Sequence, residues 1–494
     1  MKASSLVALA CCAMVGAAWA KAGAKDVTVK GGTVERQEAG CWKIVCPAGE
    51  KQVDVVFPAP TSDDGATAMF VNFYSPDLTR FFRFIVRVFD DRQSGFQRFF
   101  PNPPHSGEWA ELRLDRAKGE PANGGVPDWG RLGSVKFTIE VASPEGGVVF
   151  LGSPRVDCPA ALRPAKAGER RLMWCLSDAL GRRKDWDETA AFLKKNGFTD
   201  MIVLSSRAAT AFYDSAVLAR ADNWPESVDN LRDGIAAARK HGLKFHAWKT
   251  CWQIRKETPK ELVRKFEDEG RYQVSASGEV NKGWLCPSDP RNRELMLAGY
   301  KEFVDRGADG IHFDFIRYPG QSHCFCPRCL KTFSKQMGTT FSSAADIRAD
   351  PATLKKWHAF RAGFISSVVC KAAHYAHAKG KEVSAAVFRN APTDYRDNGQ
   401  DWVRWCNEGW LDFVCPMDYF QSPDMFRGYV MRQREWLKDS KAKFYPGIGV
   451  SSAWPFQNLV DELNLLRENE IEGFTVFPLG KNPEETVFPK LFAQ

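Results

Sequence analysis

Apolar and polar positions follow one pattern up to about residue 157 and a different pattern from residue 170 onwards. In the first part, short alternating stretches are separated by turns rich in Gly, Pro, Asp and Ser, and no helical period is visible. Alternation with period two indicates half-buried strands, and short strands at regular spacing are typical of a β-sandwich. We therefore expect residues 21–158 to form an all-β, jelly-roll-like domain. Its predicted strands are 42–45, 52–57, 68–73, 82–89, 109–114, 135–140 and 147–151.

From residue 170, strand patterns alternate with helical ones. The stretch between the two parts, residues 159–169, contains Pro164 and several Ala and is predicted to be a linker. Eight strand–helix repeats over residues 170–494 predict a (β/α)8 TIM barrel, an α/β fold of the expected size. Asp289, directly before Pro290, is predicted to cap the helix that leads into the fourth strand. The predicted strands are 172–176, 201–204, 244–252, 311–316, 382–388, 411–419, 444–450 and 473–477.

The first 20 residues carry the features of a cleavable signal peptide. Lys2 is followed by an apolar run and by Ala18-Trp19-Ala20, which fits a cleavage site after Ala20. We therefore expect a secreted or periplasmic protein. No later stretch approaches 18 consecutive apolar residues, so no membrane span is predicted.

Composition and charge narrow the function classes. The formal net charge of +8 is scattered, with no basic block and no nucleic-acid-binding motif, so no nucleic-acid partner is predicted. No P-loop, dinucleotide fingerprint or Ser-His-Asp arrangement is visible, so we expect no organic cofactor. The 16 Trp and 35 Phe either fill the cores or provide flat surfaces on which sugars stack. Oligomeric state remains open.

Six motifs in residues 170–480 resemble, in order, a glycosyl hydrolase-like family related to family 10 glycosidases. The fourth-strand motif is the most specific of them. The resemblance implies a TIM-barrel glycoside hydrolase that acts on a polysaccharide or oligosaccharide. The motifs are FHAW (245–248), WLCPSDP (284–290), DGIHFDFIRYP (309–319), GWLDFVCP (409–416), PGIGV (446–450) and GFTVF (473–477).

Two carboxyl residues are candidates for the chemistry of such an enzyme. Glycoside hydrolysis normally needs one carboxyl as acid and one as base or nucleophile, and TIM barrels keep catalytic groups at the C-terminal ends of their strands. Asp314 ends the predicted fourth strand and Asp418 ends the sixth, an arrangement similar to several α-retaining barrel clans. We expect Asp314 to be nucleophile or base and Asp418 to be the general acid. The alternative for Asp314 is a structural role as the cap of the following loop.

Other polar and aromatic residues near predicted strand ends are candidates for binding the sugar. Arg or His beside a carboxylate keeps it ionised, and Trp or Tyr can stack on a pyranose ring. Two of the candidates have plain structural alternatives, because a strand histidine such as His312 is often a core residue and Asp178 can cap a helix. The candidates are Asp178, His246, Trp248, His312, Arg317, Tyr318, Arg389, Asn390 and Tyr419.

A cysteine cluster follows the fourth strand. Cys324, Cys326 and Cys329 have C-x-C-x2-C spacing, and Cys286 lies 38 residues before Cys324, an arrangement similar to the zinc cluster of family 42 β-galactosidases. We expect these four to hold a structural zinc ion, with His323 as the alternative fourth ligand. Export favours the rival interpretation, disulfide bonds.

The N-terminal domain contains two more cysteines that bear on disulfide formation. Cys41 and Cys46 flank a short apolar run and are candidates for a disulfide.

The combined expectation is an exported two-domain glycosidase. The closing strands of the N-terminal domain resemble those of carbohydrate-binding modules, although a plain structural appendage fits equally well. Two alternatives remain for the whole chain: a catalytically silent carbohydrate-binding protein, and a metal-dependent hydrolase of carbohydrate substituents. The sugar, the linkage and the stereochemical course are not predicted.

Overall fold

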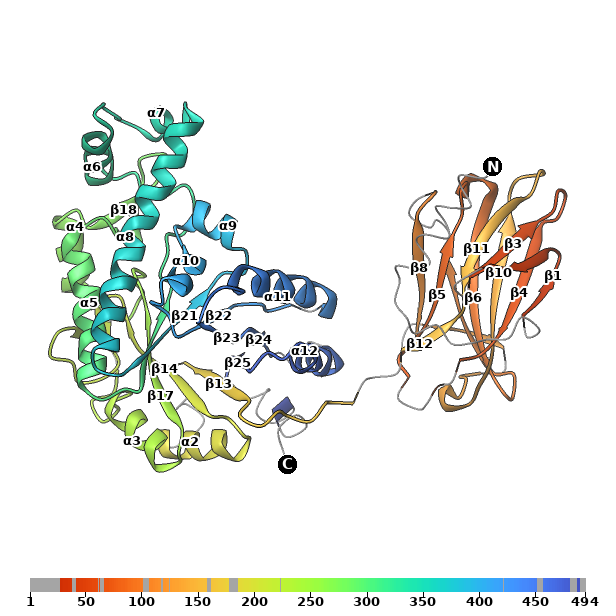
Figure 1. Cartoon of the computed structure of the whole chain (residues 1–494), viewed down its shortest axis with the longest axis horizontal. Helices are drawn as coiled ribbons and strands as arrows, with labels where there is room; N and C mark the ends of the chain where they lie inside the picture. The colour runs from red at the N-terminus through yellow and green to blue at the C-terminus, as the bar shows by residue number, and fades with distance from the viewer. Residues whose placement is uncertain are drawn as a thin grey trace. The chain divides into compact units, whose positions relative to one another are not determined.

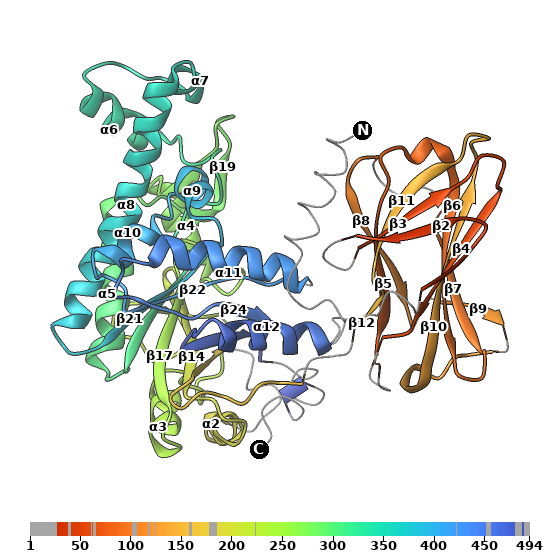
Figure 2. The ribbon, with the colours of Figure 1, turned by 45° about the vertical axis from the view of Figure 1, so that its right-hand side comes forward.

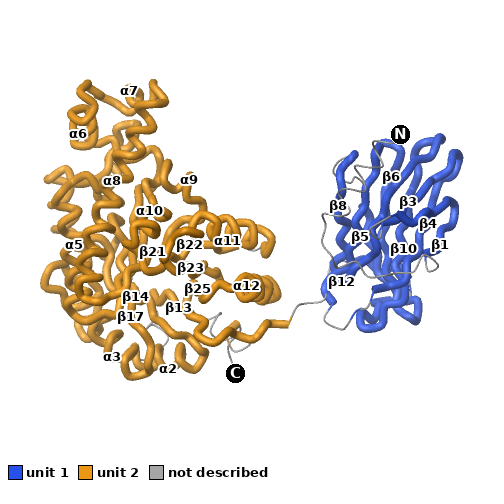
Figure 3. The backbone as a smooth tube through the Cα atoms, in the orientation of Figure 1, with its two compact units in different colours: residues 1–160 blue, residues 161–494 orange. Residues whose placement is uncertain are grey.

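The computed structural model describes residues 27–488 apart from 38–40, 61, 63–65, 101–105, 117–118, 124, 158–160, 177–184, 223, 421, 451–455 and 480–486. The chain forms two compact units, residues 1–160 and residues 161–494 (Figure 3). Their boundary falls inside the predicted linker. The predicted signal peptide lies outside the described residues.

The first unit consists of two antiparallel sheets, as expected for a β-sandwich. One sheet has the order β1-β4-β10-β6-β7-β9, and the other has the order β12-β5-β11-β3-β2, with β8 also paired to β5. The first sheet contains β1 (Thr28–Lys30), β4 (Gln52–Pro58), β6 (Phe81–Asp90), β7 (Gly95–Phe100), β9 (Glu120–Asn123) and β10 (Leu132–Val141). The second contains β2 (Thr33–Arg36), β3 (Cys41–Cys46), β5 (Ala68–Tyr74), β8 (Trp109–Asp115), β11 (Gly147–Gly152) and β12 (Arg155–Asp157).

The alternation seen in the sequence places one face of each sheet in a shared hydrophobic core. On β4, for example, Val53, Val55 and Phe57 are buried, and they belong to one cluster with residues of the other sheet. The predicted disulfide between Cys41 and Cys46 is wrong, because these residues are the two ends of the single strand β3. Five residues of extended chain span about 16 Å, whereas a disulfide needs Cα atoms about 4–7 Å apart.

The second unit is built on a curled parallel sheet, compatible with the predicted (β/α)8 barrel (Figure 1). Pairing runs from β13 through β14, β17, β20, β21 and β22 to β23, and from β24 through β25 back to β13. The strands are β13 (Arg170–Cys175), β14 (Asp200–Arg207), β17 (Lys244–Thr250), β20 (Gly310–Asp314), β21 (Glu382–Val387), β22 (Phe413–Pro416), β23 (Lys443–Phe444), β24 (Gly447–Gly449) and β25 (Gly473–Phe477). Two short strands, β15 (Thr210–Ala211) and β16 (Ala219–Arg220), extend the edge of β14.

Helices connect these strands on the outside of the sheet (Figures 1 and 2). Asp289 caps α5 with its side chain, as predicted. The helices are α2 (Trp186–Lys195), α3 (Arg232–Lys240), α4 (Lys260–Asp268), α5 (Pro290–Asp305), α8 (Pro351–His377), α9 (Ala391–Thr393), α10 (Trp402–Asn407), α11 (Pro423–Leu437) and α12 (Phe456–Glu468). None of the described helices is both long enough and apolar enough to cross a membrane.

The excursion after β20 contains elements that the sequence pattern does not predict. Helices α6 (Pro327–Met337) and α7 (Ala344–Arg348) stand at one end of the long helix α8, and both views show them away from the barrel strands (Figures 1 and 2).

A hairpin of β18 (Tyr272–Val274) and β19 (Val280–Leu285) precedes α5. The predicted seventh strand is split into β23 and β24 around Pro446, which has no N–H to donate to a neighbouring strand.

Candidate active site

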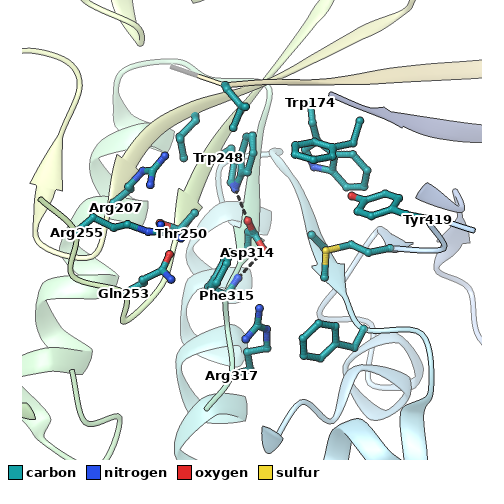
Figure 4. A pocket seen from close by; sticks show the side chains of 16 residues that line it. Trp174, Arg207, Trp248, Thr250, Gln253, Arg255, Asp314, Phe315, Arg317 and Tyr419 are labelled. Atoms are coloured by element: carbon teal, nitrogen blue, oxygen red, sulfur yellow. Dashed lines mark hydrogen bonds between the residues drawn. The ribbon is translucent and has the colours of Figure 1, made fainter. Parts of the chain in front are cut away.

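A cavity of about 310 Å³ opens at the C-terminal ends of the barrel strands, where TIM barrels carry their chemistry (Figure 4). Seven strands or the turns that follow them supply its walls: β13, β14, β17, β20, β21, β22 and β25. The lining residues are Trp174, Leu176, Leu204, Arg207, Trp248, Thr250, Gln253, Arg255, Asp314, Phe315, Arg317, Ala386, Phe388, Met417, Tyr419 and Phe477. Asp314 is the one carboxyl residue among the described residues that line it.

Asp314 is the last residue of β20, and both of its carboxyl oxygens accept hydrogen bonds. The indole Nε1 of Trp248 donates to Oδ2 at 3.1 Å, and the backbone N–H of Phe315 donates to Oδ1 at 2.7 Å. The side chain is buried, and this burial raises the pKa of Asp314, while the nearby Arg317 guanidinium and the two donors act in the opposite direction. The arrangement fits a carboxylate held in one orientation in a site with little water.

The backbone turns sharply where three strands enter the cavity. Ala208 after β14, Trp252 after β17 and Phe315 after β20 all have positive φ, at 39°, 63° and 49°. This left-handed region is unfavourable for residues with bulky side chains and typically costs about 1–3 kcal/mol. At Phe315 the turn directs its N–H at Oδ1 of the preceding Asp314, so the strained conformation helps to hold the carboxylate.

Aromatic side chains form one wall of the cavity. Tyr419 stacks on Phe477 with ring centroids 5.5 Å apart, and Trp174 packs edge-on against Tyr419 (Figure 4). The indole of Trp174 donates to Nε2 of His312 at 2.9 Å, so the proton of the neutral ring is on Nδ1, 2.9 Å from Oγ of Ser384. Burial lowers the pKa of His312 well below its usual value. His312 therefore supports Trp174 from below and does not line the cavity itself.

Three arginines line the opposite side of the cavity and its rim. Arg207 lies 3.1 Å from Glu257, whereas Arg255 is exposed and has no ion pair among the described residues. The guanidinium of Arg317 lies between two aromatic rings, 4.3 Å from the centroid of Phe315 and 4.2 Å from that of Phe388. The lining thus carries three cationic groups and one carboxyl group.

His246 is not among the residues that line this cavity, which argues against its predicted contact with substrate. Strand β17 extends to Thr250, so His246 is near its start, paired with Gly310 at the start of β20. The His246 ring is fully buried at the N-terminal end of the barrel, 2.9 Å from Asp200. Arg170 joins this group through ion pairs to Asp200 and to Glu382 at 2.6 Å. These residues form a buried structural ion-pair network.

Asp418 is also absent from the lining, which argues against its predicted role as proton donor in this cavity. Met417 and Tyr419 on either side of it line the cavity, whereas the side chain of Asp418 contacts Gln433 instead. It is fully buried, and its Oδ1 accepts a hydrogen bond from Gln433 of α11 at 2.9 Å. Burial raises the pKa of Asp418 to about 8, and burial together with the charge of Asp418 raises that of Glu462 on α12 to about 9.

The remaining predicted binding residues are divided. Trp248, Arg317 and Tyr419 line the cavity as expected. Tyr318 is fully buried and packs under the guanidinium of Arg361, so it does not reach the cavity. Arg389 lies over the ring of Phe420. Asn390 donates its backbone N–H to Asp394. Neither Arg389 nor Asn390 is part of the described lining, and Asp178 lies outside the described residues.

The four predicted metal-ligating cysteines come together in one cluster. All are buried, and the four Sγ atoms lie within 4.8 Å of one another. His323, the alternative ligand, lies outside this group, with its ring nitrogens beside Asn281 and Ser322.

Sequence reasoning missed several lining residues that share a simple signal. Arg207, Gln253 and Arg255 each lie at or just after the C-terminal end of a barrel strand. TIM barrels carry their functional residues at this position. Trp174 lies in the first strand, where its large apolar ring is indistinguishable from a core residue in sequence. Only the register of neighbouring strands brings it to the cavity.

The placement of Asp418 predicts a pH-dependent stability effect. Because its pKa is raised on folding, the folded state holds a proton that the unfolded state loses between about pH 4 and 8, and stability falls as pH rises through this range. Asp418→Asn, whose amide can keep the contact with Gln433, lacks this titration and is expected to be about 5 kcal/mol more stable than wild type at pH 8, and nearly equal at pH 4. Urea unfolding at both pH values measures this.

The exposed Asp439→Asn is the control and should leave the unfolding curve unchanged at both pH values. Loss of glycan hydrolysis in a well-folded Asp418→Asn protein would contradict the placement of Asp418 outside the reaction site.

Comparison with known proteins identifies the family of this chain. The sequence profile of the glycosyl hydrolase-like 10 family matches residues 172–452, more than half of the chain. Glycosyl hydrolase DigH of Escherichia coli K12 is 22% identical over 294 residues, which are 52% of this chain but only 63% of DigH. The β-amylase catalytic domain of Paenibacillus polymyxa has a TM-score of 0.48 at 12% identity, covering 67% of this chain and 98% of that domain. The glycoside hydrolase domain of PelA from Pseudomonas aeruginosa has a TM-score of 0.38 at 9% identity, covering 63% of this chain and 95% of that domain. The chain belongs to the glycosyl hydrolase-like 10 family.

Proposed function

We propose that the barrel hydrolyses O-glycosidic bonds in a polysaccharide or oligosaccharide, with Asp314 as the carboxylate that acts at the anomeric carbon. The observation that carries this proposal is the position of Asp314, at a strand end in the cavity with both oxygens held by donors. Membership of a glycosyl hydrolase-like family supports the reaction class. The signal-peptide pattern of residues 1–20 supports a reaction on exported or extracellular glycan.

The geometry assigns Asp314 a role in its ionised form. Hydrogen bonds from Trp248 and from the Phe315 backbone stabilise the carboxylate and leave one lone pair on each oxygen. Such a group either attacks the anomeric carbon directly or takes a proton from the attacking water. The aromatic wall around Tyr419 gives the sugar a flat surface, and the closed packing around Asp314 limits water.

The charges of the cavity favour an acidic glycan as substrate. The transition state of glycoside hydrolysis has oxocarbenium character and gains positive charge. Arg207 is paired with Glu257, but the guanidinium groups of Arg255 and Arg317 at the cavity would oppose that charge if the substrate were neutral. A sugar that carries carboxylate or sulfate groups would offset them and bind through charge-assisted hydrogen bonds. We therefore assign Arg207, Arg255 and Arg317 to recognition of acidic groups on the substrate.

A second function, glycan binding without hydrolysis, is favoured by one specific observation. Two carboxyls are the usual requirement, and among the described residues the cavity lining contains only Asp314. A barrel that retained the aromatic wall and the arginines but lacked a proton donor would bind acidic glycans and release no product.

Asp314→Asn tests the catalytic assignment. Wild type is expected to release fragments from a panel of acidic polysaccharides, including uronate-containing and sulfated ones, and the variant should be slower by roughly 10²–10⁴-fold. Product chromatography measures release. The exposed Asp439→Asn is the control, and equal release by Asp314→Asn and wild type would move the catalytic group elsewhere. Binding of the glycan by wild type without any release would establish the second function.

Azide added to Asp314→Ala separates the two roles of the carboxylate. In either role, azide is expected to fill the vacated space and attack the anomeric carbon, the bond to the leaving-group oxygen breaks, and a glycosyl azide of inverted configuration forms, which mass spectrometry and NMR detect. The wild-type product then separates the roles: retention of the anomeric configuration identifies Asp314 as the nucleophile, and inversion identifies it as the base.

Trp248→Phe tests the hydrogen bond to the carboxylate. Loss of a donor to a charged acceptor removes about 1.5–3 kcal/mol of stabilisation, so the pKa of Asp314 should rise and the acidic limb of the kcat/KM profile should move about one unit to higher pH. Trp174→Phe, which lines the same cavity but donates to His312 instead, is the matched control and should leave the limb in place. A Trp248→Phe profile superimposable on wild type contradicts the assigned role.

Arg255→Gln tests the preference for acidic substrates. Because Arg255 is exposed and unpaired among the described residues, its removal should leave the fold intact and raise KM for an acidic oligosaccharide about fivefold, or ~1 kcal/mol, at low salt. The effect should shrink at high salt. The neighbouring Lys256→Gln, outside the lining, controls for net charge. Equal KM changes on neutral and acidic substrates would contradict the preference while leaving the glycosidase proposal intact.

A further inference from the structure

We propose that Cys286, Cys324, Cys326 and Cys329 bind one zinc ion as a tetrathiolate centre, and that this centre fixes the segment that carries Phe315 and Arg317 into the cavity. The proposal rests on the cysteine cluster itself and on its packing, so it stands or falls separately from the proposed hydrolysis. The ion has a structural role here, because four protein ligands leave no open position for substrate or water.

The spacing of the sulfur atoms fits a metal centre better than disulfide bonds. Tetrahedral zinc with Zn–S bonds of about 2.3 Å places its sulfurs about 3.8 Å apart. The Sγ atom of Cys286 lies 3.7 Å from that of Cys326 and 3.6 Å from that of Cys329. A disulfide would bring two of them to about 2.05 Å. The four sulfurs converge on one point, as a shared ion requires.

The surroundings of the sulfurs supply the donors that thiolates need. The backbone N–H of Val274 lies 3.3 Å from Sγ of Cys324. The hydroxyl of Ser288 lies 3.1 Å from Sγ of both Cys286 and Cys329, so it can donate to one of them. Cys326 precedes the first turn of α6, where the helix dipole favours negative charge. Each contact stabilises a deprotonated sulfur.

A buried arginine next to the cluster indicates that the cluster is negatively charged. Arg361 is 1% exposed, and its guanidinium donates to the backbone oxygens of Gly320 and Asp397, with no carboxylate within ion-pair distance among the described residues. It interacts electrostatically with Cys324 and Cys329 and also with Asp397, whose carboxylate lies beyond ion-pair distance. An unpaired buried cation is costly. Four thiolates around Zn²⁺ carry a net charge of −2 and provide the counter-charge, which neutral thiols or disulfides do not.

The cluster joins two segments that both contact the cavity. Cys286 directly follows β19, and Trp284 of that strand packs on Phe315 with ring centroids 5.8 Å apart and lies 5.7 Å from the Arg317 guanidinium. The other three cysteines follow β20 within fifteen residues of Asp314. A metal ion that ties these segments together therefore holds Phe315 and Arg317 against Trp284.

Metal analysis of the full chain tests the site directly. Protein purified without added metal is expected to contain about one zinc per chain by mass spectrometry, and Co²⁺ exchanged into it should give the visible bands of a tetrahedral cobalt thiolate. Cys286→Ser and Cys329→Ser should lose most of the metal, whereas Cys370→Ser, on α8 outside the cluster, should retain it. Absence of metal from wild type together with failure to take up Co²⁺, or intact mass showing these cysteines in disulfides, would overturn the proposal.

Arg361 variants test the charge argument without touching a ligand. Arg361→Lys keeps the positive charge and should retain zinc against a chelator, whereas Arg361→Gln should release it roughly tenfold faster. Equal release rates in the two variants would contradict the negative charge assigned to the cluster.

Hydrogen exchange on wild type tests the link to the cavity and avoids any folding defect of a variant. Removal of zinc by a chelator should speed exchange of backbone amides in peptides covering residues 314–330. Peptides of β6 in the first unit are the internal control and should not change. Zinc loss that leaves exchange in residues 314–330 unaltered would show that the ion does not fix this segment.

Discussion

The mouth of the barrel depends on one constraint, which is the burial of the Asp314 carboxyl group. A carboxylate that leaves water must be compensated by donors or by charge, and three neighbours do this in different ways. Trp248 supplies an indole N–H from the adjacent strand, the Phe315 backbone supplies a second donor through a strained turn, and Arg317 supplies positive charge. The register of β17 against β20, which pairs Thr250 with Asp314, makes the first of these contacts geometrically available. Orientation of the carboxylate is thus a property of two strands and one turn together.

The requirement that a buried charge be compensated also separates functional from structural charges elsewhere in the barrel. At its N-terminal end, Arg170 forms an ion pair with Asp200, and Asp200 lies 2.9 Å from His246, so these buried charges compensate one another. Asp418 and Glu462 lack such partners, and burial keeps both carboxyls protonated near neutral pH instead. The cavity arginines differ from both groups, because Arg255 and Arg317 have no ion pair among the described residues, whereas Arg207 is paired with Glu257. Water solvates an excess of positive charge beside an open cavity, and the same charge attracts an anion that binds there.

The sequence was informative where a pattern is local and uninformative where a contact depends on register. Period-two alternation predicted β20 and placed Asp314 at its end, and cysteine spacing predicted the four-sulfur cluster, because both signals lie within short stretches of chain. His246 was placed at the wrong end of the barrel because the strand β17 begins only two residues before it. Asp418 was predicted to face the cavity, yet the alternation around Met417 and Tyr419 turns it towards α11 and α12. Tyr318 packs on Arg361 for a similar reason: the chain has already left the barrel mouth at that residue.

Residues 314–329 connect the cavity, where Asp314 lies, to the cysteine cluster, where Cys329 lies. The turn at Phe315 is unfavourable by itself, and a few residues of loop cannot hold an unfavourable conformation unless their other end is anchored. The excursion that contains α6 and α7 also makes apolar contacts, because Phe333 of α6 packs on Trp357 of α8 with ring centroids 4.9 Å apart and Ile347 of α7 is buried in the same core cluster. Metal binding would add folding free energy to these contacts. A centre formed by Cys286 and the three cysteines after β20 would therefore anchor the excursion and, through Trp284, keep Arg317 and Phe315 in the positions that the Asp314 carboxylate requires.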